Sequence, residues 1–428
     1  MEVVSSKYLL ITIFTVSFLF IAWERWHRTV ISMLAAIAVI VLGYLTPQEA
    51  WNFIDFNTLG LLLGMMIIVS FFRRTGFFEY IAIKAIKVSK GDYFILFAFF
   101  FILTGVVSAF LDNVTTVLVF SPIIILVTKM TGISPFPYLI GEIIASNIGG
   151  TATLIGDPPN IIIGSASGLS FNDFIANLAL PVAVIMVLTI FFLKWMFSKE
   201  YKISGKFDVS KVKIDERGAV KNKGLLVKTL FVFGFVIIGF VLHDKLKILP
   251  SIVALTGAVV LLFLNNENPE PFFHEVEWTT LFFFGGLFIL VGALEKFHII
   301  ESIANFLLRF SKGELTLILI IGFLSFFFTT IMGAIPFVVT MAPIINAIIN
   351  KMPNIHGETL WWTLSLTSCF MGNATLISAA ANLVVADISG KTEKKITFKN
   401  YLKYGFPASV FTFIIAMGYV ILKYYILR

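Results

Sequence analysis

Residues 146–160 read SNIGGTATLIGDPPN, and they interrupt one of the long apolar stretches of the chain. The Gly149-Gly150 pair permits backbone conformations that other residues resist. Asp157 is followed by two prolines, which lack an amide proton and disfavour a helical conformation at the residue before them. We therefore expect a helix that begins near Pro137 to unwind within this segment.

The composition around this segment is typical of a membrane protein. Of the 428 residues, 58% are hydrophobic and 13% are charged, whereas soluble domains carry about 25% charged residues. Many charge-free stretches approach the roughly 20 residues with which a helix crosses a bilayer. The Lys and Arg residues lie mainly between these stretches, so the net charge of +7 indicates membrane topology and no nucleic-acid partner. We predict an all-α, multi-pass protein of the cell membrane.

The chain also contains an internal repeat. A shift of 222 residues places ATLI at 152–155 on ATLI at 374–377, and Gly64 on Gly286. A shared offset over most of the chain indicates a duplicated unit. Gly60 and Gly64 form a GxxxG pattern, which we interpret as a site of close helix packing.

The charges beside the repeats indicate that the two copies have opposite orientations. The loop after residue 168 has no Lys or Arg before Lys194, whereas the equivalent loop after residue 390 is rich in lysine. Equivalent loops of opposite charge character are expected on opposite sides of a membrane. We predict two inverted repeats, each with about five transmembrane helices and one re-entrant hairpin. The predicted domains are a first repeat at 1–198, a cytoplasmic basic linker at 199–228 and a second repeat at 229–428.

Three acidic residues, Asp112, Glu142 and Asp157, lie deep within the apolar stretches of the first repeat. A charge at the centre of a bilayer costs at least ~2.5 kcal/mol, so it is kept where it faces a polar cavity or binds an ion. Asp112 begins the string DNVTT within the hairpin expected over 93–129, where two half-helices would meet and expose backbone groups that bind ions. Glu142 is a candidate proton carrier; a buried acid that only fixes packing is the alternative. The candidates for ion or substrate binding in this repeat are Asp112, Asn113, Thr115, Ser146, Asn147, Thr151, Thr153, Asp157 and Asn160.

The second repeat has a matching break without acidic residues. Ala379 stands in place of Asp157, and the hairpin expected over 315–350 has GAIP at 333–336 where the first has Asp112. The candidate binding residues here are Asn373, Thr375, Ser378 and Asn382. We infer that the first repeat carries the coupling cation or proton, and that the second supplies neutral ligands. Apart from a sodium ion at Asp112, Asn113 and Asp157, no metal and no cofactor is predicted.

Three blocks of the sequence resemble the ion transporter superfamily. They are LDNVTTVLVFSP at 111–122, SNIGGTATLIGDPPNIIIGSASGLSFNDF at 146–174 and WWTLSLTSCFMGNATLISAAANLVVA at 361–386. The most similar branch holds arsenite permeases, NhaD-type sodium/proton antiporters and the melanosomal P protein, with citrate and dicarboxylate carriers as more distant members. The resemblance covers nearly the whole chain, and it implies inverted repeats whose hairpins and broken helices meet at the midplane, elevator-like or rocking transport, and frequent dimers. Relatives usually have an Asp-Asn-type pair at the second hairpin tip, so GAIP there argues against a symmetric two-ion stoichiometry.

The expected function is secondary active, ion-coupled transport of a small anion or oxyanion, of the arsenite or carboxylate type, by alternating access and without enzymatic activity. The coupling ion is Na⁺ or H⁺, and the expected partners are the substrate, the lipid bilayer and a second copy of the chain. A sodium/proton antiporter is the alternative, because the acids can themselves carry the cargo and no Lys or Arg lies deep in the predicted spans. A neutral substrate or helix N-termini would remove the need for such a cation. The chain has no Walker-type loop, so ATP would act only through a separate subunit.

Overall fold

The fold is described from a computed structural model of the chain, and it is helical throughout its described residues, in which no strand occurs. Eight helices are long and apolar enough to cross a membrane by length and composition. The predicted all-α, multi-pass architecture is therefore confirmed. The described residues are 2–23, 25–198, 205–207, 219–353, 355–390, 392 and 394–427.

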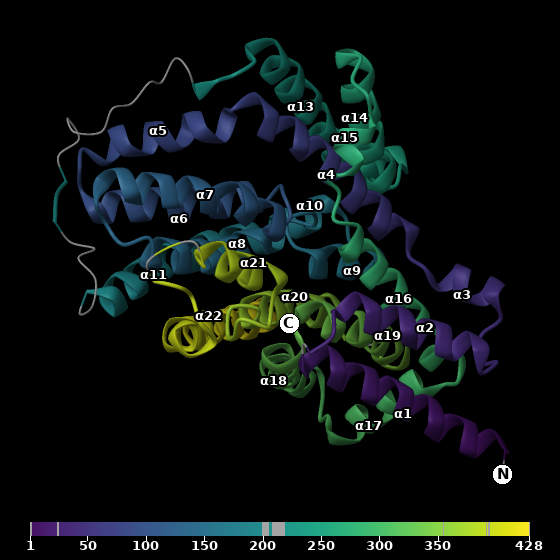
Figure 1. The fold of residues 1–428 in the computed structure, drawn as a ribbon. Coiled ribbons are helices and arrows are strands. Elements are labelled where there is room, and N and C mark those ends of the chain that lie inside the picture. The colour runs from purple at the N-terminus through teal and green to yellow at the C-terminus, as the bar shows by residue number, and fades with distance from the viewer. Residues whose placement is uncertain are drawn as a thin grey trace.

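The helices follow the chain in the order shown in Figure 1. The first half contains α1 (Glu2–Trp23), α2 (Arg28–Val41), α3 (Pro47–Phe53), α4 (Phe56–Thr75), α5 (Phe77–Ser89), α6 (Tyr93–Ser108), α7 (Asn113–Thr131), α8 (Phe136–Gly150), α9 (Pro158–Ser167), α10 (Phe171–Phe174), the π-helix Ile175–Ala179 and α11 (Leu180–Phe197). The second half contains α13 (Lys223–Leu246), α14 (Pro250–Asn265), α15 (Glu270–Phe273), α16 (Trp278–Lys296), α17 (Ile299–Phe310), α18 (Glu314–Met332), α19 (Ala334–Lys351), α20 (Glu358–Met371), α21 (Ala380–Ser389) and α22 (Phe398–Leu427).

The duplication is visible in the helix boundaries. The helices α2, α4, α5 and α9 begin 222 residues before α14, α16, α17 and α21, respectively. The sequence offset therefore corresponds to equivalent structural elements. The opposite orientation of the two copies stays a prediction, as do the domain boundaries.

Both predicted hairpins are interrupted where the sequence indicates. In the first, α6 ends at Ser108 and α7 begins after Asp112, and the two helices pack together. In the second, α18 and α19 are separated by Gly333 alone, whose φ of 89° lies in the region that favours glycine. The charge-free run at 315–350 is therefore two helices and not one span.

The broken helices are also present. The helix α8 ends at Gly150, and α9 starts only at Pro158, because the residue before two prolines adopts the extended conformation seen at Asp157 (φ −138°). A side-chain carbon on Gly150 would lie 2.7 Å from the Gly156 carbonyl oxygen, so the returning backbone requires glycine there. In the second half, residues 372–379 separate α20 from α21 in the same way.

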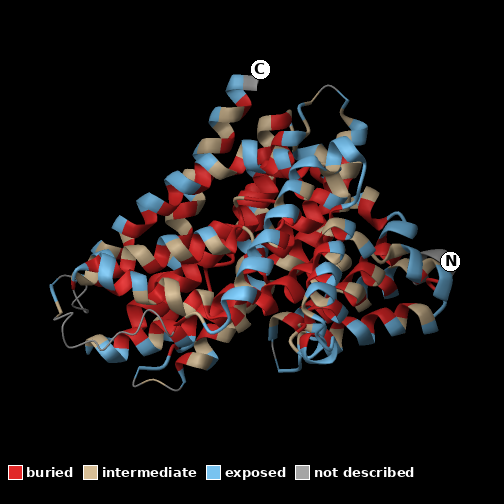
Figure 2. Cartoon of the chain, turned by 90° about the horizontal axis from the view of Figure 1, so that it is seen from above, coloured by how far each residue is buried: buried red, intermediate tan, exposed pale blue. Residues whose placement is uncertain are grey.

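The broken helices occupy the centre of the molecule, and long apolar helices surround them. Every residue of α8 is buried, and Figure 2 shows buried residues concentrated through the middle of the cartoon. Exposed large apolar side chains instead gather on outer helices, with Phe235 on α13, Phe263 on α14 and Ile414 on α22 as examples. Lipid tails are the natural cover for such residues, because a soluble monomer rarely exposes extended apolar surface.

Helices of the two halves exchange partners. The helix α2 packs against α16, and its equivalent α14 packs against α4. At these crossings a side-chain carbon on Gly64 would lie 2.6 Å from the Ala254 backbone, and one on Gly286 would lie 2.7 Å from the Ser32 backbone. The interpretation of the GxxxG glycine Gly64 as a packing residue is confirmed, and the structure adds its repeat equivalent.

Gly286→Ala is expected to lower the thermal stability of the purified protein, because the new methyl group meets the backbone of α2, which cannot move aside as a side chain can. Gly285→Ala is the matched control, since no described atom lies within 4 Å of the position of its new carbon. Alanine also favours a helix over glycine by about 1 kcal/mol. Thermal unfolding in detergent should therefore order the proteins as Gly285→Ala, wild type and Gly286→Ala, from most to least stable. Equal melting temperatures for the two variants would contradict the packing argument.

Two features of the fold differ from the sequence prediction. The helices α5 and α17 were not expected, because charged residues such as Glu79 and Arg309 interrupt their apolar character. In addition, α13 begins at Lys223, inside the predicted linker, because the Asn222 side chain caps it by accepting from the Leu225 amide at 2.9 Å. The linker residues 199–204 and 208–218 lie outside the described residues.

Candidate ion and substrate site

The two breaks and the two hairpin tips meet at a small internal cavity with a volume of about 40 Å³. A buried water requires about 10–15 Å³, so this space corresponds to roughly three waters or one small ion with part of its hydration shell. Of the residues predicted from the sequence, five line the cavity: Asp112, Asn113, Asn147, Asp157 and Ser378. Residues from both halves therefore contribute to one site.

Six helices of the described chain begin at this cavity. Their first residues or N-caps lie in its lining: Arg28 of α2, Asp112 before α7, Asp157 before α9, Glu277 before α16, Gly333 before α19 and Ala379 before α21. Each helix N-terminus carries a partial positive charge. Carboxylates stand at three of these ends, whereas glycine and alanine stand at the ends of α19 and α21. The cavity thus combines two acidic side chains of the first half and Glu277 of the second half with the starts of α19 and α21, which no described side chain caps.

The carboxylate of Asp112 caps α7. Its Oδ1 accepts from the Thr115 amide at 2.9 Å, and its Oδ2 accepts from the Thr115 hydroxyl. The residue is only 5% exposed. This cap holds a charged side chain at the tip of the hairpin, as the capping residues of the DNVTT string predict.

A chain of hydrogen-bonded amides connects Asp157 with the second half. The Asn113 Nδ2 donates to Asp157 Oδ1 at 3.2 Å and to Asn147 Oδ1 at 2.8 Å. The Asn147 Nδ2 in turn donates to the side-chain oxygens of Asn373 at 2.8 Å and Asn382 at 3.0 Å. Asn147 therefore ties both broken helices together at the cavity.

Two equivalent asparagines hold the unwound backbone. The Asn160 Nδ2 donates to the carbonyls of Thr151 (3.0 Å) and Thr153 (2.8 Å). Asn382 donates to the carbonyls of Gly372 (2.7 Å) and Thr375 (2.8 Å). Buried carbonyls without partners would destabilise each break, so these asparagines stabilise it.

The remaining predicted residues of the breaks also bind backbone. The hydroxyl of Thr153 donates to the Ala109 carbonyl, and that of its equivalent Thr375 donates to the Thr330 carbonyl at 3.1 Å. These bonds join each break to the neighbouring hairpin. Ser146 and Thr151 donate to carbonyls of their own helix, those of Ile143 and Asn147.

Glu142 does not line the cavity. It lies on α8 and is 1% exposed. Its Oε2 accepts from the Ser121 hydroxyl at 2.8 Å, and its Oε1 has no hydrogen-bond partner in the described part of the structure. The third deep acid of the sequence is thus separate from the other two.

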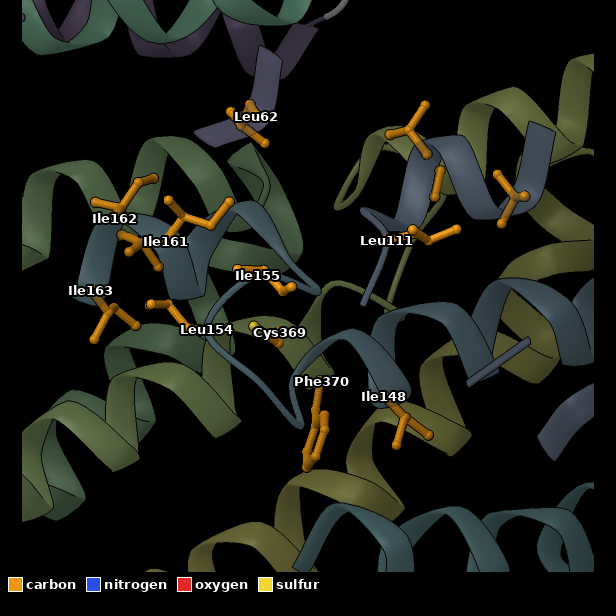
Figure 3. Close-up of a cluster of buried hydrophobic side chains, with 14 of the residues drawn as sticks. Leu62, Leu111, Ile148, Leu154, Ile155, Ile161, Ile162, Ile163, Cys369 and Phe370 are labelled. Carbon is orange, nitrogen blue, oxygen red and sulfur yellow. The ribbon is translucent and has the colours of Figure 1, made fainter. Parts of the chain in front are cut away.

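Apolar side chains enclose the unwound segment. Figure 3 shows Leu154 and Ile155 on the loop between α8 and α9, with Ile161 and Ile162 of α9 beside them and Cys369 of α20 facing the loop. These side chains are almost fully buried. Protein therefore surrounds the irregular backbone, which is the condition for such backbone at membrane depth.

The sequence did not identify four of the polar side chains in the lining: Arg28, Thr280, Glu277 and Cys369. Arg28 and Glu277 flank charge-free stretches, a position that usually places charged side chains at the membrane surface. Thr280 donates its hydroxyl to Glu277 Oε2 at 3.1 Å. The Cys369 thiol lies 3.9 Å from Asn160 Oδ1. For Cys369 the repeat offset was the available signal, because it is the equivalent of the predicted site residue Asn147.

The chain is similar to known transporters along most of its length. The family model CitMHS, described as a citrate transporter, matches residues 18–367. An uncharacterized transporter of Mycobacterium tuberculosis is 37% identical over 425 residues, which cover 97% of this chain and 98% of that protein. The human P protein is 30% identical over 493 residues, which cover 94% of this chain and 58% of that longer protein.

Two solved structures share the fold. The YdaH transporter of Alcanivorax borkumensis has a TM-score of 0.59 at 13% identity, and the match covers 90% of this chain and 88% of that one. MtrF of Neisseria gonorrhoeae, described as one of a class of antimetabolite efflux pumps, has a TM-score of 0.62 at 12% identity and covers 91% and 84%. The resemblance to the ion transporter superfamily is confirmed by the family match. The chain is a multi-pass membrane transporter that belongs to the CitMHS citrate transporter family.

Proposed function

We propose that the chain is a secondary active transporter that couples the movement of a small anion or oxyanion to Na⁺ or H⁺ by alternating access. One observation carries this proposal. The cavity is lined by two carboxylates of the first half, Asp112 and Asp157, and by the starts of α19 and α21 in the second half, where no acid stands. A cation is favoured beside the former and an anion beside the latter.

The cation would bind between Asp112, Asn113 and Asp157. Sodium is a hard cation that prefers oxygen ligands, and all three side chains carry oxygen. The Asn113 amide nitrogen is already committed to Asp157 and Asn147, so its oxygen is the atom that remains for a cation. A proton on one of the two carboxylates would serve the same coupling role. Glu142 stays a candidate proton carrier, at a buried position outside the cavity.

The anion would bind beside Ser378 and the starts of α19 and α21. The description of the matched family suggests a carboxylate, and the resemblance of the sequence blocks suggests an oxyanion such as arsenite. Pockets for drug-sized molecules measure about 300–1,000 Å³, so the cavity of about 40 Å³ matches a small ion. A larger anion requires the hairpins and the surrounding helices to separate, as alternating access demands.

Sodium/proton antiport is the second candidate, and the charge of the cavity favours it. Three carboxylates, those of Asp112, Asp157 and Glu277, line the cavity, against Arg28 as the one cation in its described lining. Two or more acids around a small space suit exchange of one cation for another.

The discriminating experiment uses purified protein in liposomes with imposed sodium and proton gradients. Uptake of arsenite, phosphate, citrate and succinate against their own gradients is measured in parallel with a pH-sensitive dye inside the vesicles. We expect a sodium or proton gradient to drive uphill uptake of one of these anions. Sodium-driven proton movement without uptake of any anion would identify the antiporter instead, and downhill movement alone would identify a channel.

A further inference from the structure

Arg28 and Glu277 face the cavity from α2 and α16, which are distinct from the hairpins and broken helices that supply the predicted site. The two helix starts are fixed to each other, because the Thr29 hydroxyl donates to the Thr279 carbonyl at 2.7 Å. The Arg28 guanidinium lies 5.2 Å from the centre of the Phe283 ring on the next turn of α16. This contact directs the arginine side chain along the wall of the cavity.

Glu277 is not used as a helix cap. Its Oε2 accepts from the Thr280 hydroxyl, while its buried Oε1 has no hydrogen-bond partner among the described residues. The guanidinium of Arg28 and this carboxylate line the same cavity. A buried carboxylate oxygen without a hydrogen bond is costly, and a positive charge that lines the same cavity lowers this cost.

The equivalent position in the first half gives a direct comparison. Asp55 caps α4 and is saturated, since its carboxylate accepts from the Asn57 amide at 3.0 Å, the Thr58 amide at 3.1 Å and the Thr58 hydroxyl. The equivalent of Arg28 is Pro250, which carries no charge. The pair of charges therefore occurs at one of two structurally equivalent helix crossings, so the crossing itself does not require it.

We propose that Arg28 recognises the anionic group of the transported solute, and that Glu277 competes with the solute for Arg28 across the cavity. Guanidinium groups bind carboxylates and oxyanions with two parallel hydrogen bonds. A solute anion in the cavity and Glu277 would attract the same guanidinium, so Glu277 opposes binding of the anion. This inference rests on the proposed anion transport, and it adds the cation that the predicted spans lack.

The test compares Arg28→Gln, Arg28→Lys, Glu277→Gln and the wild type in liposomes, with citrate and inorganic phosphate as probes. Arg28→Gln is expected to raise the KM of the transported anion by about 10- to 100-fold, the effect of losing a charged hydrogen bond. Arg28→Lys should retain part of the affinity, and Glu277→Gln should lower the KM because the competing charge is gone. The sodium concentration that half-maximally stabilises the detergent-solubilised protein should change less than the KM in all three variants, because Arg28 and Glu277 act on the coupling ion only through the electrostatic field of the cavity.

Arg25→Gln is the matched control. Arg25 lies three residues earlier, is exposed and contacts Trp23 and Trp26 instead of the cavity. A wild-type KM in Arg28→Gln would overturn the assignment of Arg28 to anion recognition and leave the proposed function intact. A shift in the half-maximal sodium concentration of Arg28→Gln as large as the rise in its KM would do the same. Wild-type vesicles that take up neither citrate nor phosphate would overturn this inference, and if arsenite and succinate also fail to enter, the proposed anion transport is overturned too. A higher KM in Glu277→Gln would overturn the role given to Glu277.

Discussion

Replacing Asp157 by asparagine is expected to abolish the coupling of transport to the cation gradient. Asparagine has almost the same shape and can still accept the hydrogen bond from Asn113 Nδ2, so the substitution removes the negative charge with little change of packing. A bond to a charged partner contributes about 1.5–3 kcal/mol, which corresponds to roughly 10- to 100-fold in the half-saturating sodium concentration. Sodium-dependent uptake into liposomes measures this loss.

Asp112→Asn should have the same effect by the same reasoning. Asparagine caps helices about as well as aspartate, so the start of α7 should remain intact. The fold is checked independently by thermal unfolding of the purified variants. Full sodium dependence in both variants would remove the first half of the cavity from the coupling site.

The repeat offers a control that keeps the charge but moves it. Ala379 precedes α21 as Asp157 precedes α9, and both residues line the cavity. The double variant Asp157→Asn/Ala379→Asp therefore preserves the number of carboxylates while transferring one to the second half. If binding of the coupling ion depends on the position of the charge, this variant stays uncoupled. It also loses anion uptake, because the new carboxylate repels the anion at the start of α21. Restored coupling would show that only the total charge matters.

The breaks and hairpin tips could be predicted because local rules decide them. Two prolines after Asp157 keep that residue out of the helical conformation and begin α9, and glycines at 149–150 mark the place where the backbone returns closely. The repeat offset then transferred the same expectation to the second half, where α21 begins at the equivalent of α9. Local chemistry and duplication together were sufficient for this part of the fold.

The partners of the site residues could not be predicted, because they depend on contacts between distant parts of the chain. Thr153 and Asn160 were expected to bind an ion or substrate, and in this conformation they bind backbone carbonyls of the break and of the hairpin instead. A polar side chain in an unwound segment can serve either purpose, and composition does not distinguish them. Arg28 and Glu277 were missed for a related reason: their places at the ends of apolar stretches indicate the membrane surface, while the packing of α2 on α16 brings them to the cavity.

Asn147→Leu is expected to destabilise the protein more than any other substitution considered for the breaks. Leucine has a similar volume but cannot form the hydrogen bonds that Asn147 forms with three other asparagines. The side-chain oxygens of Asn373 and Asn382 would lose a donor inside a fully buried cluster. Each unsatisfied buried group costs about 1–3 kcal/mol, so a loss of roughly 2–6 kcal/mol is expected. A strongly lowered melting temperature in detergent, with or without sodium, is the measurement.

The equivalent position, Cys369, provides the comparison. Its thiol lies 3.9 Å from Asn160 Oδ1, but that oxygen already accepts from the Ser365 hydroxyl at 2.6 Å, so Asn160 keeps a partner when the thiol is removed. Cys369→Ala is therefore expected to lower the melting temperature only slightly, through the lost volume of one sulfur atom. If Asn147→Leu were as mild as Cys369→Ala, the amide chain would contribute little to joining the halves. The larger effect at Asn147 follows because its single amide group connects Asp157, through Asn113, to the break of the second half.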